Sequence, residues 1–120
     1  LRCVRTACAP HGFSMQLLGH SKPLYLPVAH PAVQILTDCY NEATGTNSAP
    51  YVTGGGTYAR HMPNCVAFGC EFPGRTSPFG AERGGFHQPD ECISIDDLLS
   101  SLKIYILALL RMDQADLPSI

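Results

Sequence analysis

The sequence predicts an α/β fold, because helical and strand-like segments alternate along its 120 residues. Apolar residues recur at helical spacing between Pro31 and Gly45 and again over 98–112, whereas strand-like apolar runs occupy 13–17, 51–53 and 65–68. A few short strands beside two long helices form only a thin sheet with an open edge and an uncovered face. This pattern is typical of part of a larger domain.

The N-terminal segment combines a helix end with an extended stretch. Residues Leu1–Ala9 are expected to be the end of a helix that Pro10 and Gly12 break. After the strand-like run at 13–17, two prolines keep 22–28 extended. The chain starts at a leucine instead of a methionine, which favours a fragment or a processed chain.

Both long helices have recognisable start and stop signals. Pro31 suits a first helical turn, and Gly45 is expected to end that helix. Ser94, with Asp97 three residues later, resembles a capping box for the second helix. The predicted apolar face of this second helix consists of Leu98, Leu102, Tyr105, Leu109 and Met112. The tail after Asp113 is expected to be frayed.

Composition excludes several classes of function. Eight basic and ten acidic residues leave little net charge, and no Lys/Arg run is present to bind nucleic acid or anionic lipid. The longest apolar stretch, Ile104–Leu110, is too short to span a bilayer, and the N-terminus lacks the apolar core of a signal peptide. We therefore expect a cytoplasmic protein without nucleic-acid or membrane partners.

Six cysteines leave two interpretations open. In a short secreted chain they would form three disulfide bridges. Against this, Cys39 and Cys65 sit in apolar segments, where a free thiol behaves as a small hydrophobe. No cysteine pair has the spacing of a zinc ribbon, because Cys3/Cys8 and Cys65/Cys70 each enclose four residues.

A glycine run forms the first candidate site. Gly54, Gly55 and Gly56 follow a short strand and precede Thr57 and Arg60. Glycines let backbone N–H groups approach an anion closely, while Thr57 adds a hydroxyl and Arg60 a cation. The alternative is a turn that needs only positive φ, and spacing does not decide between the two.

His87 forms the second candidate site, between a long Gly/Pro/Ser-rich loop at 69–85 and the last helix. A neutral imidazole there suits zinc, and Asp90 or Glu91 is placed to orient its second nitrogen. A catalytic zinc needs about three protein ligands, so His87 requires partners from elsewhere. The alternative is an ordinary surface histidine.

Other reactive side chains are interpreted as structural. The remaining histidines, His11, His20, His30 and His61, show no paired spacing. The acidic residues Asp90, Glu91, Asp96 and Asp97 are explained by a helix start instead of a carboxylate cluster. Cys65 and Cys70 are explained by core packing instead of nucleophilic catalysis.

Several motifs in fixed order resemble one enzyme family. The segments GGGTYAR, PNCVAFG, FPG, HQPDE and IDDLL, preceded by HGF, KPLYLP and HPAVQ, are similar to the C-terminal region of PepV-type dipeptidases. These are relatives of carnosinases and aminoacylases in the dizinc metallopeptidase family 20. The similarity runs from about His11 to Met112. The loop at 75–85 is longer than the family usually has before its histidine.

The resemblance implies a zinc-exopeptidase-type catalytic domain, with a mixed sheet and flanking helices, preceded by the end of a lid domain. On this basis 1–25 end the lid, 26–113 are the C-terminal part of the catalytic domain, and 114–120 are the tail. The resemblance makes His87 the last metal ligand. It makes Gly55, Gly56 and Thr57 the substrate loop, with Arg60 as a further substrate contact.

The implied chemistry is hydrolysis of dipeptides and short peptides at the N-terminal residue. Two zinc ions, with Co or Mn as substitutes, polarise the carbonyl and activate a shared water. The other ligands and the general-base glutamate belong to the N-terminal half of such enzymes, so we expect this chain to be inactive alone. The rival hypotheses are a non-enzymatic anion-binding module using the Gly54–Gly56 loop and a disulfide-stabilised secreted domain.

Overall fold

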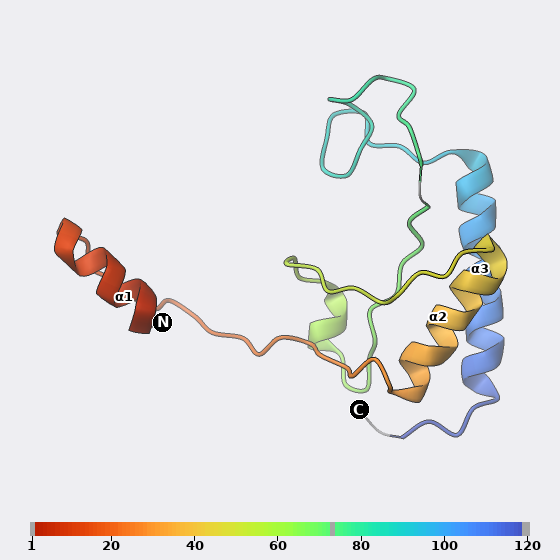
Figure 1. Cartoon of the computed structure of the whole chain (residues 1–120), viewed down its shortest axis with the longest axis horizontal. Coiled ribbons are helices and arrows are strands. Elements are labelled where there is room, and N and C mark those ends of the chain that lie inside the picture. Colours follow the sequence, from red (N-terminus) through yellow and green to blue (C-terminus); the bar gives the residue numbers. More distant parts are fainter. Residues whose placement is uncertain (1, 73, 119–120) are drawn as a thin grey trace.

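Two helices packed against each other form the centre of the structure (Figure 1). They are α2, Pro31–Thr44, and α3, Ile95–Asp113. The computed structural model describes residues 2–72 and 74–118. The predictions for Leu1, for Pro73 and for the last two residues of the tail lie outside the described residues.

Helix α2 begins and ends where the sequence predicts. The His30 side chain is the N-cap, and its Nδ1 accepts a hydrogen bond from the backbone N–H of Ala32 at 3.2 Å. Pro31 fits the first turn because it has no N–H to leave unpaired. Gly45 ends the helix with φ 67°, a conformation that glycine adopts without steric cost. His30 is thus structural, as expected.

Helix α3 also begins as predicted. The Ser94 Oγ accepts a hydrogen bond from the backbone N–H of Asp97 at 3.0 Å, and Asp96 and Asp97 lie in the first turn. Both carboxylates are favoured there by the positive end of the helix dipole. The helix ends at Asp113, and 114–118 continue without helix.

The core between the helices is small and contains short side chains. Leu36 and Cys39 of α2 pack against Ala108 of α3, and Cys39 is fully buried. Arg111 of α3 reaches across to α2, where its Nη2 lies 2.5 Å from Glu42 Oε2 and its Nη1 lies 3.8 Å from Cys39 Sγ. Ala108 and Cys39 let the helices approach closely, and Arg111 closes one end of the contact.

The predicted apolar face of α3 is largely wrong. The buried residues of this helix are Ser101, Ile104 and Ala108. By contrast, Leu98, Leu102 and Leu109 are 53%, 54% and 71% exposed. Met112 does contact the core, as predicted. Because α3 is apolar on nearly every side, periodicity alone does not define its buried face.

The predicted mixed sheet is not confirmed, since the described residues contain no strand. Residues 66–72 nevertheless show strand-like alternation. Val66, Phe68, Cys70 and Phe72 are half-buried, whereas 67, 69 and 71 are exposed. Val66 and Phe68 pack on the helix core, and the Phe68 ring meets Tyr105 edge-on at 5.7 Å. A strand also needs a neighbouring strand for its backbone groups, and the described segments at 13–28 and 51–53 do not pair with it.

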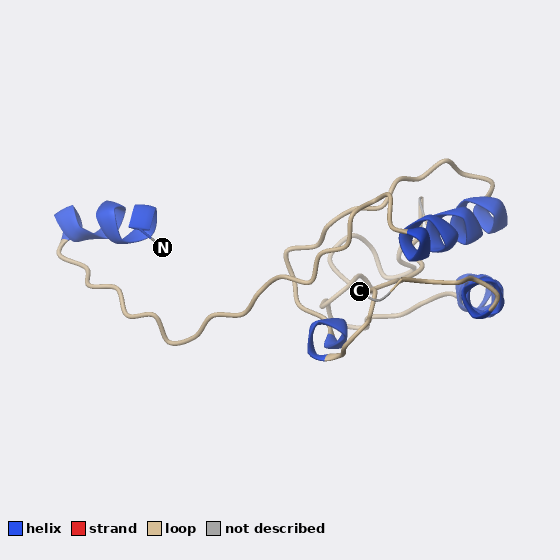
Figure 2. Cartoon of the chain, turned by 90° about the horizontal axis from the view of Figure 1, so that it is seen from below, coloured by secondary structure: helices blue, strands red, loops and turns tan. Residues whose placement is uncertain are grey.

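The N-terminal part lies away from the helix pair (Figures 1 and 2). Helix α1, Arg2–Cys8, continues into the 3₁₀ turn η1, Ala9–His11, and Gly12 ends it with φ 76°. The predicted helix end is therefore confirmed for the described residues. Among the described elements, α1 contacts only η1, and 13–28 form an extended connection to α2.

The chain is more open than a compact domain of its length. Its radius of gyration is 19.0 Å, against about 14 Å for a compact chain of this length. Its accessible surface is 9701 Å², against about 6,300 Å² for a folded monomer of this mass. Much of this excess is apolar, including the outer side of α3. The helix pair therefore has uncovered apolar surface.

All six cysteines are free thiols, and Cys39 is the buried one. Among the described helices, none combines the length and hydropathy that a bilayer-crossing segment requires.

We predict that Leu36→Ala destabilises the chain by about 2–5 kcal/mol, because it leaves a cavity in the contact between α2 and α3. The matched change Leu109→Ala removes an exposed side chain and should alter the free energy of unfolding by less than about 0.5 kcal/mol. Urea unfolding followed by circular dichroism at 222 nm measures both. Equal losses would contradict the observed orientation of α3.

Candidate functional site

His87 lies at the tip of a hydrogen-bonded turn. The backbone N–H of Gly84 donates to the Pro89 carbonyl at 2.8 Å, and that of Gln88 donates to the Gly85 carbonyl at 3.1 Å. The Gln88 side-chain oxygen accepts a hydrogen bond from the Gly85 N–H at 2.9 Å. The His87 N–H donates to Glu91 Oε2 at 3.1 Å. These bonds fix the backbone on both sides of the imidazole.

His87 itself has an uncommon backbone conformation and an exposed side chain. Its φ is 59°, in the left-handed region that few residues other than glycine adopt, although histidine is enriched there. Such strained positions persist where the surrounding structure fixes them, and they cluster at functional sites. Within the described residues the imidazole has no hydrogen-bond partner. The ring is therefore available as a ligand.

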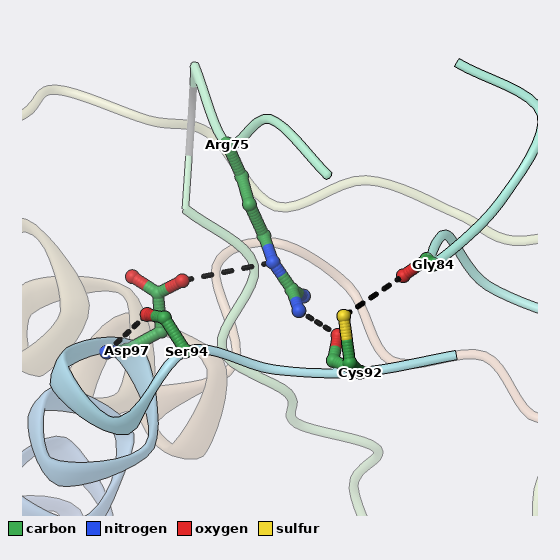
Figure 3. A network of polar contacts seen from close by, with 5 residues as sticks. All are labelled: Arg75, Gly84, Cys92, Ser94 and Asp97. Atoms are coloured by element: carbon green, nitrogen blue, oxygen red, sulfur yellow. Dashed lines mark hydrogen bonds and ion pairs between the residues drawn. The ribbon is translucent and has the colours of Figure 1, made fainter. Parts of the chain in front are cut away.

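A polar network attaches this turn to the start of α3 (Figure 3). Arg75 Nε lies 3.6 Å from Asp97 Oδ2, and the guanidinium also donates to the Cys92 carbonyl. The Cys92 N–H donates to the Gly84 carbonyl at 3.3 Å. The turn that carries His87 is therefore held to the first turn of α3 through Gly84, Cys92 and Arg75.

Gly84 is required by this arrangement. Its φ is 81°, and a Cβ at this position would clash with the Ser77 side chain and lie 3.2 Å from the Phe79 ring. A side chain at this position would force the Ser77 side chain to move, so Gly84 permits the close contact between the loop at 75–80 and the turn.

The glycine segment is not the turn with positive φ that the sequence left open as an alternative. None of Gly54, Gly55 and Gly56 has positive φ, so a strained turn does not explain them. The Arg60 guanidinium instead lies against Gly56, where a Cβ would be 2.7 Å from Arg60 Nη1. Arg60 Nε also donates to His61 Nε2 at 3.2 Å. Positive charge is thus placed directly on the glycine segment.

The short 3₁₀ turn η2, Tyr58–His61, follows this segment. Thr57 is its N-cap residue but makes no capping hydrogen bond with its side chain. Gly55, Gly56, Thr57 and Arg60 are all exposed. A single 3₁₀ turn contributes little dipole, so the cation of Arg60 dominates the electrostatics of the segment.

The two candidate sites lie apart in the chain's fold, as the separate positions of the yellow-green glycine bend and the cyan loop in Figure 1 show. A cleft lies next to each candidate site, and the two clefts have lining residues in common. A cleft of about 920 Å³ is lined by Phe86, the neighbour of His87, and a cleft of about 390 Å³ by Thr53 and Thr57. Both clefts share Ser48, Ala49, Tyr51 and Glu71 in their linings.

The carboxylates near His87 have separate roles. Asp90 pairs with Arg83, Glu91 accepts from the His87 N–H, and Asp97 pairs with Arg75. The described residues contain no group of three or more His, Cys, Asp or Glu side chains placed to hold a metal ion. His87 is thus a single exposed imidazole on a turn fixed by backbone hydrogen bonds.

The remaining histidines are exposed or structural, as expected. His11, His20 and His61 are exposed, and His30 caps α2. Arg75 was not predicted as a site residue. Its position in the Gly/Pro/Ser-rich loop gives no indication of the ion pair with Asp97, which is 22 positions away in the sequence.

Cys70 is a half-buried thiol that lies near Ser101 and Tyr105 of α3. Burial raises the pKa of Cys70, although hydrogen bonds from the side chains of Ser101 and Tyr105 lower it in part. The thiolate is the nucleophilic form, so a raised pKa makes Cys70 less reactive. Cys70 is thus half-buried beside α3, and it is not among the residues of the helix core.

Comparison with known proteins identifies the family. Residues 7–111 match Peptidase family M20/M25/M40. "Putative dipeptidase YtjP" of Bacillus subtilis is 42% identical over 100 residues, which cover 83% of this chain and 20% of that protein. "Putative dipeptidase SSP1012" of Staphylococcus saprophyticus is 34% identical over 101 residues, 84% of this chain and 20% of that protein.

A "Putative dipeptidase" of Staphylococcus epidermidis is 35% identical over 98 residues, 82% of this chain and 19% of that protein. No solved structure shows significant similarity to the chain. The chain belongs to peptidase family M20/M25/M40, and it spans about one fifth of the length of these curated relatives.

We predict that Gly84→Ala loosens the His87 turn, because alanine at φ 81° is strained and its Cβ meets the Ser77 side chain. Amide hydrogen exchange of Cys92, which donates to the Gly84 carbonyl, should accelerate about tenfold, the effect of about 1.4 kcal/mol. Gly54→Ala is the matched control, since open space surrounds Gly54. An unchanged exchange rate in Gly84→Ala would contradict the described turn.

A second prediction concerns thiol reactivity. At pH 8, Cys70 should react with iodoacetamide several-fold more slowly than the exposed Cys3, because its raised pKa leaves less thiolate. Mass spectrometry of peptides after timed quenching measures both rates, and denaturation in urea should remove the difference. Equal rates in the folded chain would refute the burial of Cys70.

Proposed function

We propose that this chain is part of a metal-dependent dipeptidase that hydrolyses short peptides at the N-terminal residue. The observation that carries the proposal is the match of residues 7–111 to an M20-type peptidase family, with relatives named as dipeptidases. The match spans both the glycine segment and His87. The anchored turn that presents an exposed imidazole supports a ligand role for His87.

His87 would hold one metal ion of a dizinc centre, with cobalt or manganese as substitutes. When bound, zinc would supply Lewis acidity toward the peptide carbonyl and activate a water. A catalytic zinc takes about three protein ligands, so the other ligands would lie on polypeptide corresponding to the remaining four fifths of the relatives. The Glu91 carboxylate, bonded to the His87 N–H, would help to keep the turn and its ring in place.

The glycine segment would bind the peptide. The segment is exposed, and the Arg60 guanidinium against Gly56 suits a carboxylate or a peptide carbonyl oxygen. Thr57, exposed and without a capping bond, would add a hydroxyl donor. In this proposal, Gly55, Gly56, Thr57 and Arg60 have the substrate role that the resemblance implies.

We also propose that the chain is inactive alone and acts with the missing N-terminal part of such an enzyme. In this proposal 1–25 belong to a lid and 26–113 to the catalytic domain. The separation of α1 from the helix pair supports this division. The proposed location is the cytoplasm.

A chimera provides the test. We replace the aligned fifth of the Bacillus subtilis relative with this chain and measure release of amino acids from dipeptides with added zinc, cobalt or manganese. The chimera should hydrolyse dipeptides, whereas the 120-residue chain alone should not. His87→Ala in the chimera should lower kcat/KM by at least about 100-fold, because loss of a ligand exceeds the 10–100-fold effect of an outer-shell change.

The matched control is His20→Ala, which removes an exposed histidine outside both candidate sites and should leave kcat/KM unchanged. Hydrolysis by the chain alone would show that essential ligands are not missing. Full activity of the His87→Ala chimera would exclude the ligand role. Binding of phosphate by the metal-free chain, with an inactive chimera, would favour the anion-binding module instead.

A further inference from the structure

We propose that the larger cleft binds an aromatic side chain of a peptide, an inference that rests on the proposed peptidase function. This aromatic cleft has a volume of about 920 Å³ and is lined by Tyr51, Phe72, Phe79 and Phe86, with Arg75 and Asp97. Sites for small molecules in proteins have volumes of about 300–1,000 Å³. The cleft is thus large enough for a dipeptide.

The aromatic rings come from separate segments and meet at one cleft. Phe79 is 54% exposed, Phe86 62% and Tyr51 78%, while Phe72 is half-buried. Large apolar side chains that gather around a hollow, instead of being scattered singly over the surface, indicate a binding site for an apolar group. Aromatic rings pack favourably with a further ring in edge-on or offset arrangements.

The charges in the cleft lining favour a neutral apolar group over an anion. Arg75 is paired with Asp97 at 3.6 Å and also donates to the Cys92 carbonyl (Figure 3). Its positive charge is therefore largely compensated. Glu71 adds a carboxylate to the same lining, which further disfavours an anionic side chain.

The position of the aromatic cleft links it to the proposed reaction. Phe86 directly precedes His87, and the smaller cleft beside the glycine segment shares Tyr51 and Glu71 with the aromatic cleft. A peptide with an aromatic side chain in the aromatic cleft would therefore lie beside the turn that carries His87, and the shared lining connects this cleft to the one beside the glycine segment. The cleft would select among peptides and take no part in bond cleavage.

Phe79 is the most suitable residue for a test. Its ring lies against Gly84, and its backbone N–H donates to Ser77 Oγ at 3.1 Å, so the loop places it without burying it. Truncation at this exposed position should preserve the fold. Phe13, 70% exposed and outside the cleft, offers the same substitution as a matched control.

The experiment uses the ¹⁵N-labelled chain in EDTA, titrated with the dipeptides Ala-Phe and Ala-Gly and followed by ¹H–¹⁵N spectra. Ala-Phe should bind at least about tenfold more tightly than Ala-Gly, as expected for burial of a phenyl ring. The amides of Phe79, Gly85 and Phe86 should shift. Phe79→Ala should weaken Ala-Phe binding about three- to tenfold, Phe79→Leu less, and Phe13→Ala not at all.

Equal affinity for the two dipeptides would overturn the proposal. So would equal losses in Phe79→Ala and Phe13→Ala, or shifts confined to the exposed leucines of α3. Because EDTA removes metal, the result does not depend on whether His87 binds zinc. An inactive chimera with aromatic binding intact would refute the proposed function alone, whereas an active chimera without aromatic preference would refute only this inference.

Discussion

The contact between α2 and α3 is the constraint on which the rest of the structure depends. Cys39 is fully buried against α3, and Ala108 is small enough to let the helices approach closely. Arg111 closes this contact through Glu42. Asp97 in the first turn of α3 forms an ion pair with Arg75. Because Arg75 belongs to the loop that leads to the His87 turn, this ion pair fixes the loop to α3. A small helix–helix core thus positions the turn that carries His87.

The sequence predicted those elements that local signals define. The caps at Ser94 and Gly45 are short-range features, and both are confirmed. The buried face of α3 was predicted wrongly because leucines occupy nearly every side of the helix, and only the partner helix determines which side is covered. The segment 66–72 has the alternation of a strand but lacks a neighbour among the described residues. Strand formation depends on distant polypeptide, so alternation alone does not establish it.

The candidate site was predicted in part. The motifs around Gly55 and His87 placed the chain in a peptidase family, and the comparisons confirm that family. The motifs did not predict the fixed turn at His87, the ion pair of Arg75 or the aromatic cleft. These features join residues that are distant in sequence, and no local pattern records them. The metal role of His87 and the substrate role of the glycine segment stay predictions.

The open architecture and the proposed chemistry are consistent with each other. The side of α3 that faces away from α2 is exposed and apolar, and the proposed metal role of His87 would need ligands from further polypeptide. The most direct test is X-ray absorption at the zinc edge, on the chimera with the Bacillus subtilis relative and on its His87→Ala variant. The account predicts that the variant loses imidazole scattering at one zinc. An unchanged zinc environment in the variant would contradict it.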